Sequence, residues 1–188
     1  MTSAFYPGAG LDMSPIVLCP DIKHWYYFDS QPLSEYGSYI INKNTYSERK
    51  ERFIRRLGTV FHQIGFECVS IIDSTFLFLN HDTATSVTYY INKIFPDDLG
   101  IVPPCGFLVM CGFDIESAFT DSMNKSPSEP QSDRLTRFLS EWDGFIIQSK
   151  SIHPSLPDRP VREIVWDESE YFLDANQTES FITIQTRK

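Results

Sequence analysis

The sequence has few of the residues that build metal sites and disulfides. Its 188 residues include four cysteines and four histidines. The histidines are scattered, with no pair at helical metal-ligand spacing. The cysteines, which show no Cys-x-x-Cys spacing, are Cys19, Cys68, Cys105 and Cys111. We therefore predict no metal site, and we interpret the cysteines as buried, reduced thiols.

Long apolar runs are also missing. No uninterrupted apolar stretch approaches about 18 residues, the length that a membrane-spanning helix needs. Tyr6-Pro7-Gly8 interrupts the apolar start of the chain, which excludes the pattern of a signal peptide there. From these absences we expect a soluble cytoplasmic protein with no membrane partner.

Positive charge is scarce, with 16 Lys and Arg against 25 Asp and Glu and a net charge of −9. Broad binding to nucleic acid needs a basic surface, so nucleic acid is not an expected partner of most of the chain. One helix-forming stretch, Arg49 to Arg56, is the exception because it is rich in Arg and Lys. Glu48 and Glu51 favour neighbouring ion pairs on a solvated helix face. The alternative is a docking patch for an acidic partner or an RNA backbone.

Two catalytic signatures are absent as well: a Gly-x-Ser-x-Gly elbow and a Walker phosphate loop. Hydrophobic residues make up 41% of the chain and aromatic residues 14%, so it has ample material for a core. The length suits one domain, and we expect a single α/β domain over residues 1–188. The polar stretch 124–132 is expected to form a mobile loop.

The order of the expected elements predicts the fold class. The expected strands and helices are Ala4–Tyr6, a short helix to Cys19, a fully buried strand His24–Phe28, a helix Ser47–Gly65, apolar β runs Phe66–Leu79 and Ser86–Phe95 joined by Asn80–Asp82, Cys105–Phe113, a helix Asp133–Trp142, Phe145–Gln148, Val161–Trp166, Glu170–Leu173 and Phe181–Gln185. A βαβ start with paired strands at the end favours a Rossmann-like three-layer sandwich. Its sheet would be mixed and mainly parallel, with antiparallel C-terminal strands.

The stretch from Ala4 to Asp12 carries the strongest functional pattern. A strand leads into the turn Gly8-Ala9-Gly10, Asp12 or Ser14 can cap the next helix, and the second strand ends in Asp29-Ser30. Strand ends of a doubly wound sheet meet in one crevice, where glycines allow close approach and an acid suits the two hydroxyls of a ribose. The predicted cofactor-binding residues are Tyr6, Gly8, Ala9, Gly10, Asp12, Asp29, Ser30 and Asp73.

At these residues the chain resembles class I S-adenosylmethionine-dependent methyltransferases. Their first motif is a strand leading into Gly-x-Gly, and their second strand ends in Asp or Glu, about 20 residues further on. The resemblance implies S-adenosylmethionine or a related nucleoside as cofactor. The sequence departs from the family at Pro7 and Leu11-Asp12. It also departs at Val102-Pro103-Pro104-Cys105, which lacks the polar first and aromatic last residue of the amino-group methyltransferase motif.

Carboxylates after later strands are the candidate catalytic groups. Asp97 and Asp98 follow Phe95-Pro96, and Asp114 follows the strand that ends near Cys111. They could orient or deprotonate a methyl acceptor, although Asp97 and Asp98 could instead cap the next helix. Three hypotheses result: a small methyltransferase-like enzyme, an inactive structural or regulatory subunit with a protein partner or as a homo-oligomer, and a metal-using nucleotide hydrolase.

Overall fold

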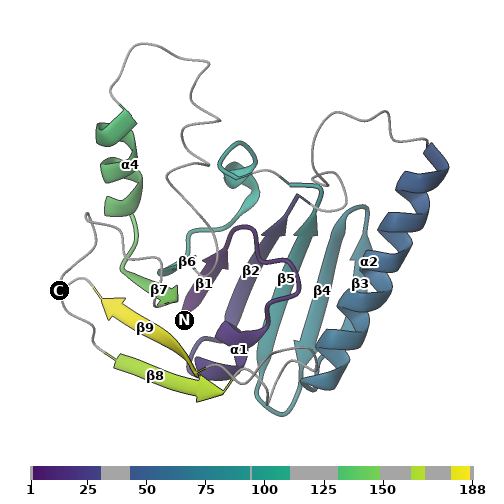
Figure 1. Cartoon of the computed structure of the whole chain (residues 1–188), viewed down its shortest axis with the longest axis horizontal. Helices are drawn as coiled ribbons and strands as arrows, with labels where there is room; N and C mark the ends of the chain where they lie inside the picture. Colours follow the sequence, from purple (N-terminus) through teal and green to yellow (C-terminus); the bar gives the residue numbers. More distant parts are fainter. Residues whose placement is uncertain are drawn as a thin grey trace. The chain divides into compact units, whose positions relative to one another are not determined.

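The computed structural model describes residues 2–30, 43–93, 95–110, 131–148, 162–167 and 179–186 (Figure 1). For residues 43–46, 49, 131–134 and 147–148 and for the last two strands, only the backbone is described. The chain divides into two compact units, Met1–Val102 and Pro103–Lys188.

The first unit is built on parallel strands with an antiparallel hairpin at one edge. Its elements are β1 (Ser3–Tyr6), α1 (Ser14–Leu18), β2 (His24–Asp29), α2 (Lys43–Gln63), β3 (Glu67–Ile72), β4 (Thr75–Asn80), β5 (Thr85–Ile91) and the short 3-10 helix η1 (Leu99–Ile101). The spatial order is β3-β4-β5-β2-β1, with β1, β2 and β5 parallel to one another. Counting only the parallel strands, this is the third-second-first order of a doubly wound half.

One face of this sheet carries an aromatic core under α2. Strand residues alternate between faces, so Tyr27, Tyr89 and Phe78 share a face. Phe61 of α2 is fully buried and stacks on Phe78, with ring centroids 4.0 Å apart and planes 12° apart. Leu57, one helical turn earlier, is also fully buried. The helix is therefore held to the sheet by large apolar side chains that follow its 3.6-residue period.

Helix α2 is longer at its start than predicted. The predicted helix began at Ser47. The observed helix begins at Lys43, so Ser47 lies inside it. The residues from Lys43 to Tyr46 include no proline or glycine, so nothing in them ends a helix. The end is as expected: Gly65 adopts φ +81°, and its N–H donates to the carbonyl of His62 at 3.1 Å.

The apolar β run predicted from Phe66 to Leu79 is divided into two strands, β3 and β4. Asp73 takes a left-handed conformation, φ +54°, and with Ser74 makes the turn between β3 and β4. Aspartate tolerates this conformation better than most residues, which explains the break. The turn predicted at Asn80–Asp82 is confirmed, because residues 81–84 connect β4 to β5.

Two burial predictions fail because they treated strands as covered on every side. Strand β2 alternates, with His24 and Tyr26 half-buried, so it is not fully buried. Cys68 is exposed because β3 is the outermost strand of its unit, while Cys19 is buried as predicted and Cys105 is half-buried. Cys111 lies outside the described residues.

The second unit contains parallel and antiparallel strands. Its elements are β6 (Phe107–Met110), α4 (Gln131–Ser140), β7 (Gly144–Gln148), β8 (Arg162–Asp167) and β9 (Glu179–Thr186). Strand β6 is parallel to β7, and β9 runs antiparallel between β7 and β8. Leu135, Phe138 and Leu139 of α4 are buried and, at spacings of three and four residues, lie on one face of the helix. The predicted strand Glu170–Leu173 and loop 124–132 lie outside the described residues.

The chain thus has an α/β, Rossmann-like fold with a mixed sheet. The central strands of the first unit are parallel, and the C-terminal strands β8 and β9 are antiparallel. Both features confirm the fold class predicted from the order of the elements.

Candidate nucleotide-binding site at the ends of β1, β2 and β5

The carboxyl ends of three neighbouring strands lie at one edge of the first unit. Because β1, β2 and β5 are parallel, their arrowheads meet at the same edge (Figure 1). Asp29 ends β2 opposite Ile91 of β5, and its carbonyl accepts a hydrogen bond from the Lys93 N–H at 3.1 Å. The predicted βαβ start is present, and it brings the glycine turn to the acid at the end of β2.

The turn after β1 uses both glycines in left-handed conformations. Gly8 has φ +64° and Gly10 has φ +54°, values that a side chain would strain. The N–H of Ala9 donates to the carbonyl of Phe28 at 3.0 Å, which fastens the turn to β2. A Cβ atom built on Gly10 would lie 3.7 Å from Oδ2 of Asp29, an ordinary contact distance. The turn therefore needs glycine for its backbone conformation, and it lies directly beside Asp29.

Asp12 organises the start of α1. Its Oδ1 accepts hydrogen bonds from the Ser14 N–H at 2.9 Å and from the Ser14 hydroxyl. Its Oδ2 accepts the hydroxyl of Tyr6 at 2.6 Å. The N-cap position itself is Met13, and Pro15 stands in the first turn. Tyr6 and Asp12 were predicted to bind a cofactor, and the structure gives them a shared role in shaping the turn.

Asp29 is buried, and a tyrosine that was not predicted lies against it. Only 5% of Asp29 is exposed. The hydroxyl of Tyr89 donates to the Gly10 carbonyl at 2.5 Å and lies 3.3 Å from Oδ2 of Asp29. Burial, and then the charge and hydrogen bond of Asp29, raise the pKa of Tyr89 well above its usual value. The tyrosine is therefore a neutral donor at physiological pH.

The other predicted residues lie around the same edge at greater distance. Ser30 follows Asp29 directly and is half-buried. Asp73 is exposed in the β3–β4 turn, and its neighbour Ser74 reaches this edge by accepting the Ile91 N–H at 2.9 Å. Asp73 is thus on the predicted edge but is separated from β2 by the width of β5.

The acidic pair after β5 is divided between two environments. Asp98 forms an ion pair with Lys93 at 3.5 Å and is half-buried, and Asp97 is exposed. The preceding Phe95 packs its ring against Phe5, with centroids 5.9 Å apart. Phe5 lies on the sheet face opposite to Tyr6, and so opposite to the Tyr89 face. Asp114, the third predicted catalytic carboxylate, lies outside the described residues.

Sequence patterns did not single out Tyr89. It lies in β5 within a run of apolar and aromatic residues, where a tyrosine is an ordinary strand former. Its pairing with Tyr27 places it two residues before the strand end. The register between β2 and β5 would have identified it, because a long side chain two positions before the end of β5 can reach the Gly8–Gly10 turn.

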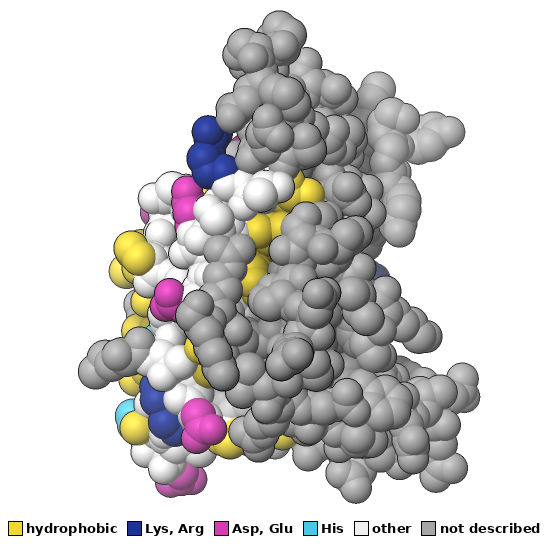
Figure 2. Space-filling model, turned by 90° about the vertical axis from the view of Figure 1, so that its left-hand side faces the viewer, with side chains coloured by type: hydrophobic (Ala, Val, Ile, Leu, Met, Phe, Trp, Pro, Cys, Tyr) yellow, Lys and Arg dark blue, Asp and Glu magenta, His cyan; other side chains and the backbone are white. Residues whose placement is uncertain are grey.

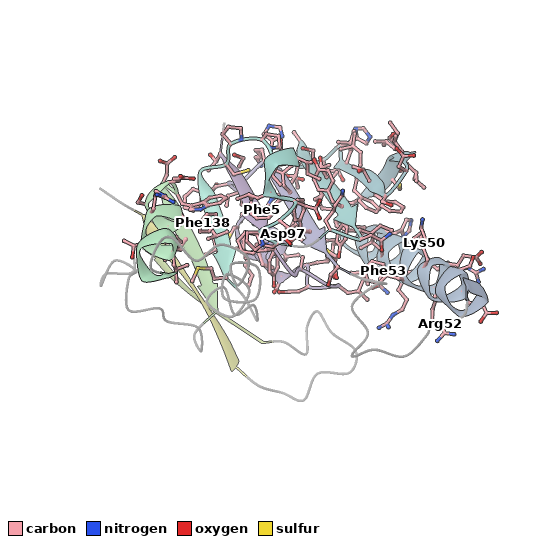
Figure 3. All side chains as sticks on the ribbon, turned by 90° about the horizontal axis from the view of Figure 1, so that it is seen from above. Phe5, Lys50, Arg52, Phe53, Asp97 and Phe138 are labelled. Carbon is pink, nitrogen blue, oxygen red and sulfur yellow. The ribbon has the colours of Figure 1, made fainter. Side chains whose placement is uncertain are left out.

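The basic residues of α2 lie largely on its solvated side. Arg52, Arg55 and Arg56 are exposed, and Arg55 forms an ion pair with Glu51 at 3.4 Å. Figure 3 shows Arg52 directed away from the strands and Phe53 on the sheet side of the same helix. Figure 2 shows the side of the molecule away from α2, where a few Lys, Arg, Asp and Glu side chains lie among white and hydrophobic described surface. The exposed arginines and the Arg55–Glu51 ion pair agree with the prediction of a solvated face with neighbouring ion pairs.

The described residues also bear on metal binding and on membrane crossing. Among the described residues, no group of three or more His, Cys, Asp or Glu side chains is placed to hold a metal ion. None of the helices in the described ranges is both long and apolar enough to cross a membrane.

Comparison with known proteins finds distant structural neighbours and no sequence relative. No family model and no curated protein matches the chain. It is similar to a Streptococcus pneumoniae structure described as a putative tRNA (m1A22) methyltransferase, at 10% identity and a TM-score of 0.39, covering 100% of this chain and 64% of that one. The chain therefore spans about two thirds of that protein.

Two other similar structures are described as a methylase and as a putative methyltransferase. One is an rRNA methylase from Streptococcus thermophilus, with 9% identity, a TM-score of 0.40, and coverage of 100% and 88% of the two chains. The other is a putative methyltransferase from Streptococcus mutans in complex with S-adenosylhomocysteine, with 10% identity, a TM-score of 0.41, and coverage of 100% and 89%. Similarity at this level carries neither a family nor an activity over to this chain.

Proposed function

We propose that the edge formed by the Gly8–Gly10 turn and Asp29 binds S-adenosylmethionine or a related ribonucleoside. One observation carries this proposal: a left-handed Gly10 lies beside the carboxylate that ends the neighbouring parallel strand, with 3.7 Å between its Cβ position and Asp29 Oδ2. A carboxylate there can accept hydrogen bonds from both hydroxyls of a ribose. The glycines leave room for the rest of the nucleoside to approach the backbone.

The burial of Asp29 bears on how a nucleoside would bind. With 5% of the residue exposed, a ribose reaches the carboxylate only after the atoms covering it move. A hydrogen bond formed at such a shielded carboxylate is stronger than one formed in water. The ligand therefore takes the place of the atoms that cover Asp29. Its charge-assisted hydrogen bonds to the carboxylate offset the free energy needed to move those atoms.

Methyl transfer is the finer part of the proposal. An acceptor that loses a proton as it gains a methyl group needs a base close by. Asp97 and Asp98 follow β5 in the chain, and Asp97 is the more exposed of the two, so we propose Asp97 as the first candidate for this base. Asp114 stays a proposed catalytic residue on the sequence pattern alone.

Calorimetric titration tests the binding proposal. Purified protein is titrated with S-adenosylmethionine and S-adenosylhomocysteine, alongside Asp29→Ala and the control Asp82→Ala. Asp82 is an exposed acid in the β4–β5 turn, at the opposite end of β5. Losing hydrogen bonds to a charged acceptor should weaken binding by about tenfold or more in Asp29→Ala. Asp82→Ala should bind as the unmodified protein does.

Two results would overturn the proposal. One is the absence of heat from either ligand at millimolar concentration with the unmodified protein. The other is an Asp29→Ala variant that binds with unchanged affinity.

The edge strand β3 supports a second candidate, a structural subunit that self-associates. Val69, Ile71 and Ile72 are 46%, 61% and 68% exposed, and β3 is the outermost described strand of its unit, so it presents apolar side chains beside an edge that no described strand pairs with. We propose that a second copy of the chain binds at the edge of β3, because two copies of one strand can pair antiparallel to each other about a two-fold axis. Glu67 is the one charged residue in β3, so like charges need not oppose each other.

Light scattering tests this candidate. The unmodified protein should have the mass of a dimer, and Ile71→Lys should have that of a monomer because it places a charge in the joined edge. A monomeric unmodified protein, or a dimer that persists in Ile71→Lys, would count against self-association through β3.

A further inference from the structure

The ring of Tyr89 is fixed in the core of the first unit. Tyr89 has no exposed surface, and its ring lies 5.7 Å from the ring of Tyr27 and 6.3 Å from those of Phe53 and Phe61. These neighbours come from β2 and α2, so the tyrosine is held from both the sheet and the helix. A side chain packed in this way places its hydroxyl at a defined point.

That point lies between the two parts of the proposed nucleoside site. The hydroxyl has one hydrogen and two acceptors: the Gly10 carbonyl at 2.5 Å and Asp29 Oδ2 at 3.3 Å. The shorter distance makes Gly10 the main acceptor, and Asp29 Oδ2 shares the hydrogen at the longer distance. Tyr89 thereby fastens the turn after β1 from one side, while the Phe28 carbonyl fastens it from the other through the Ala9 N–H.

The same hydroxyl limits where the Asp29 carboxylate can lie. Oδ2 accepts a hydrogen bond from the Tyr89 hydroxyl. The charge of Asp29 in turn helps to keep this hydroxyl protonated. When a ribose hydroxyl approaches Asp29, Tyr89 remains bonded to Gly10 and need not be displaced. The distance between turn and carboxylate is therefore set by β5 before any ligand arrives.

We infer that Tyr89 is a positioning residue that holds Asp29 against the glycine turn and so gives the site a preference for ribonucleosides over 2′-deoxyribonucleosides. This inference rests on the proposed nucleoside binding. Two adjacent hydroxyls bond one carboxylate well only if both oxygens face them, which demands a fixed carboxylate. A single hydroxyl tolerates a rotated carboxylate. Loss of the phenol should therefore weaken ribose binding more than deoxyribose binding.

Ligand discrimination tests this role. The unmodified protein, Tyr89→Phe and the control Tyr90→Phe are titrated with adenosine and 2′-deoxyadenosine. Tyr90 is the next residue in β5, and its ring contacts Phe28 on the opposite face of the sheet. We expect about a tenfold preference for adenosine in the unmodified protein and in Tyr90→Phe. In Tyr89→Phe the preference should fall severalfold, mainly through weaker adenosine binding.

The outcomes separate the inference from the proposed function. If the unmodified protein binds neither nucleoside, the proposed function fails, and the inference fails with it. If it binds, and Tyr89→Phe weakens both nucleosides by the same factor or leaves the preference unchanged, only the inference fails, because a merely structural role gives those results.

A measurement on the unmodified protein covers the case in which Tyr89→Phe does not fold. The buried Tyr89 hydroxyl proton is followed by NMR. Its chemical shift should change more on adding adenosine than on adding 2′-deoxyadenosine, and equal changes would overturn the inference.

Discussion

The buried hydroxyl of Tyr89 makes the stability of the protein depend on pH in the alkaline range. Burial, assisted by Asp29, raises the pKa of this hydroxyl well above its usual value in the folded protein. In the unfolded chain a tyrosine titrates near pH 10. Above that pH the unfolded chain loses a proton that the folded protein keeps. The stabilisation from Tyr89 is therefore fully present below about pH 10 and is lost as the pH rises toward the folded-state pKa.

The size of the effect follows from one proton. A single group that is ionised in the unfolded state and protonated in the folded state changes the free energy of unfolding by about 1.4 kcal/mol per pH unit. The chain has nine tyrosines, so the contribution of Tyr89 must be obtained by difference. Tyr89→Phe should be less stable by about 1–3 kcal/mol at pH 8, because the Gly10 carbonyl loses its donor.

Urea unfolding followed by tryptophan fluorescence at pH 8, 9, 10, 10.5 and 11 provides the test. The stability difference between the unmodified protein and Tyr89→Phe should be constant up to about pH 9 and should shrink by about 1.4 kcal/mol by pH 11. Tyr90→Phe, altered on the opposite face of the same strand, should keep the alkaline decline. Equal declines in the unmodified protein and in Tyr89→Phe would refute the reasoning.

Three other substitutions test the packing around the site by urea unfolding at pH 7. Phe61→Ala should cost about 3–5 kcal/mol because it removes a fully buried ring that stacks on Phe78; a cost below about 1 kcal/mol would show that α2 is not held there. Gly10→Ala should cost about 1–2 kcal/mol through its left-handed backbone, and no loss would mean that the turn has another conformation. Lys93→Met should change stability by less than about 1 kcal/mol, since its ion pair with Asp98 is about one-third exposed; a larger loss would indicate further dependence on Lys93.

Local chemistry made the first part of the fold predictable. Pro7 and two glycines end β1, and Asp29 ends an apolar strand, so the βαβ start follows from neighbouring residues. The buried residues Leu57 and Phe61 of α2 stand four residues apart, a spacing that indicates the covered side of a helix. Where a few adjacent residues decide the structure, the sequence was sufficient.

The remaining features depend on residues far apart in the chain. The exposure of Cys68 follows from the place of β3 at the edge of its unit, which no local pattern contains. The role of Tyr89 follows from a register that brings its hydroxyl to Gly10, 79 residues away. Such contacts are set by strand pairing, so sequence analysis proposed Asp29 and the glycines but missed the tyrosine between them.

Protein labelled with ¹⁵N-glycine gives the most direct test of nucleoside binding at the glycine turn. Amide spectra are recorded as S-adenosylhomocysteine is added. The Gly8 and Gly10 signals should shift with the ligand, whereas those of Gly58 in α2 and Gly100 in η1 should stay in place. Shifts confined to Gly58 or Gly100, or no shift at millimolar ligand, would contradict a nucleoside site beside Asp29.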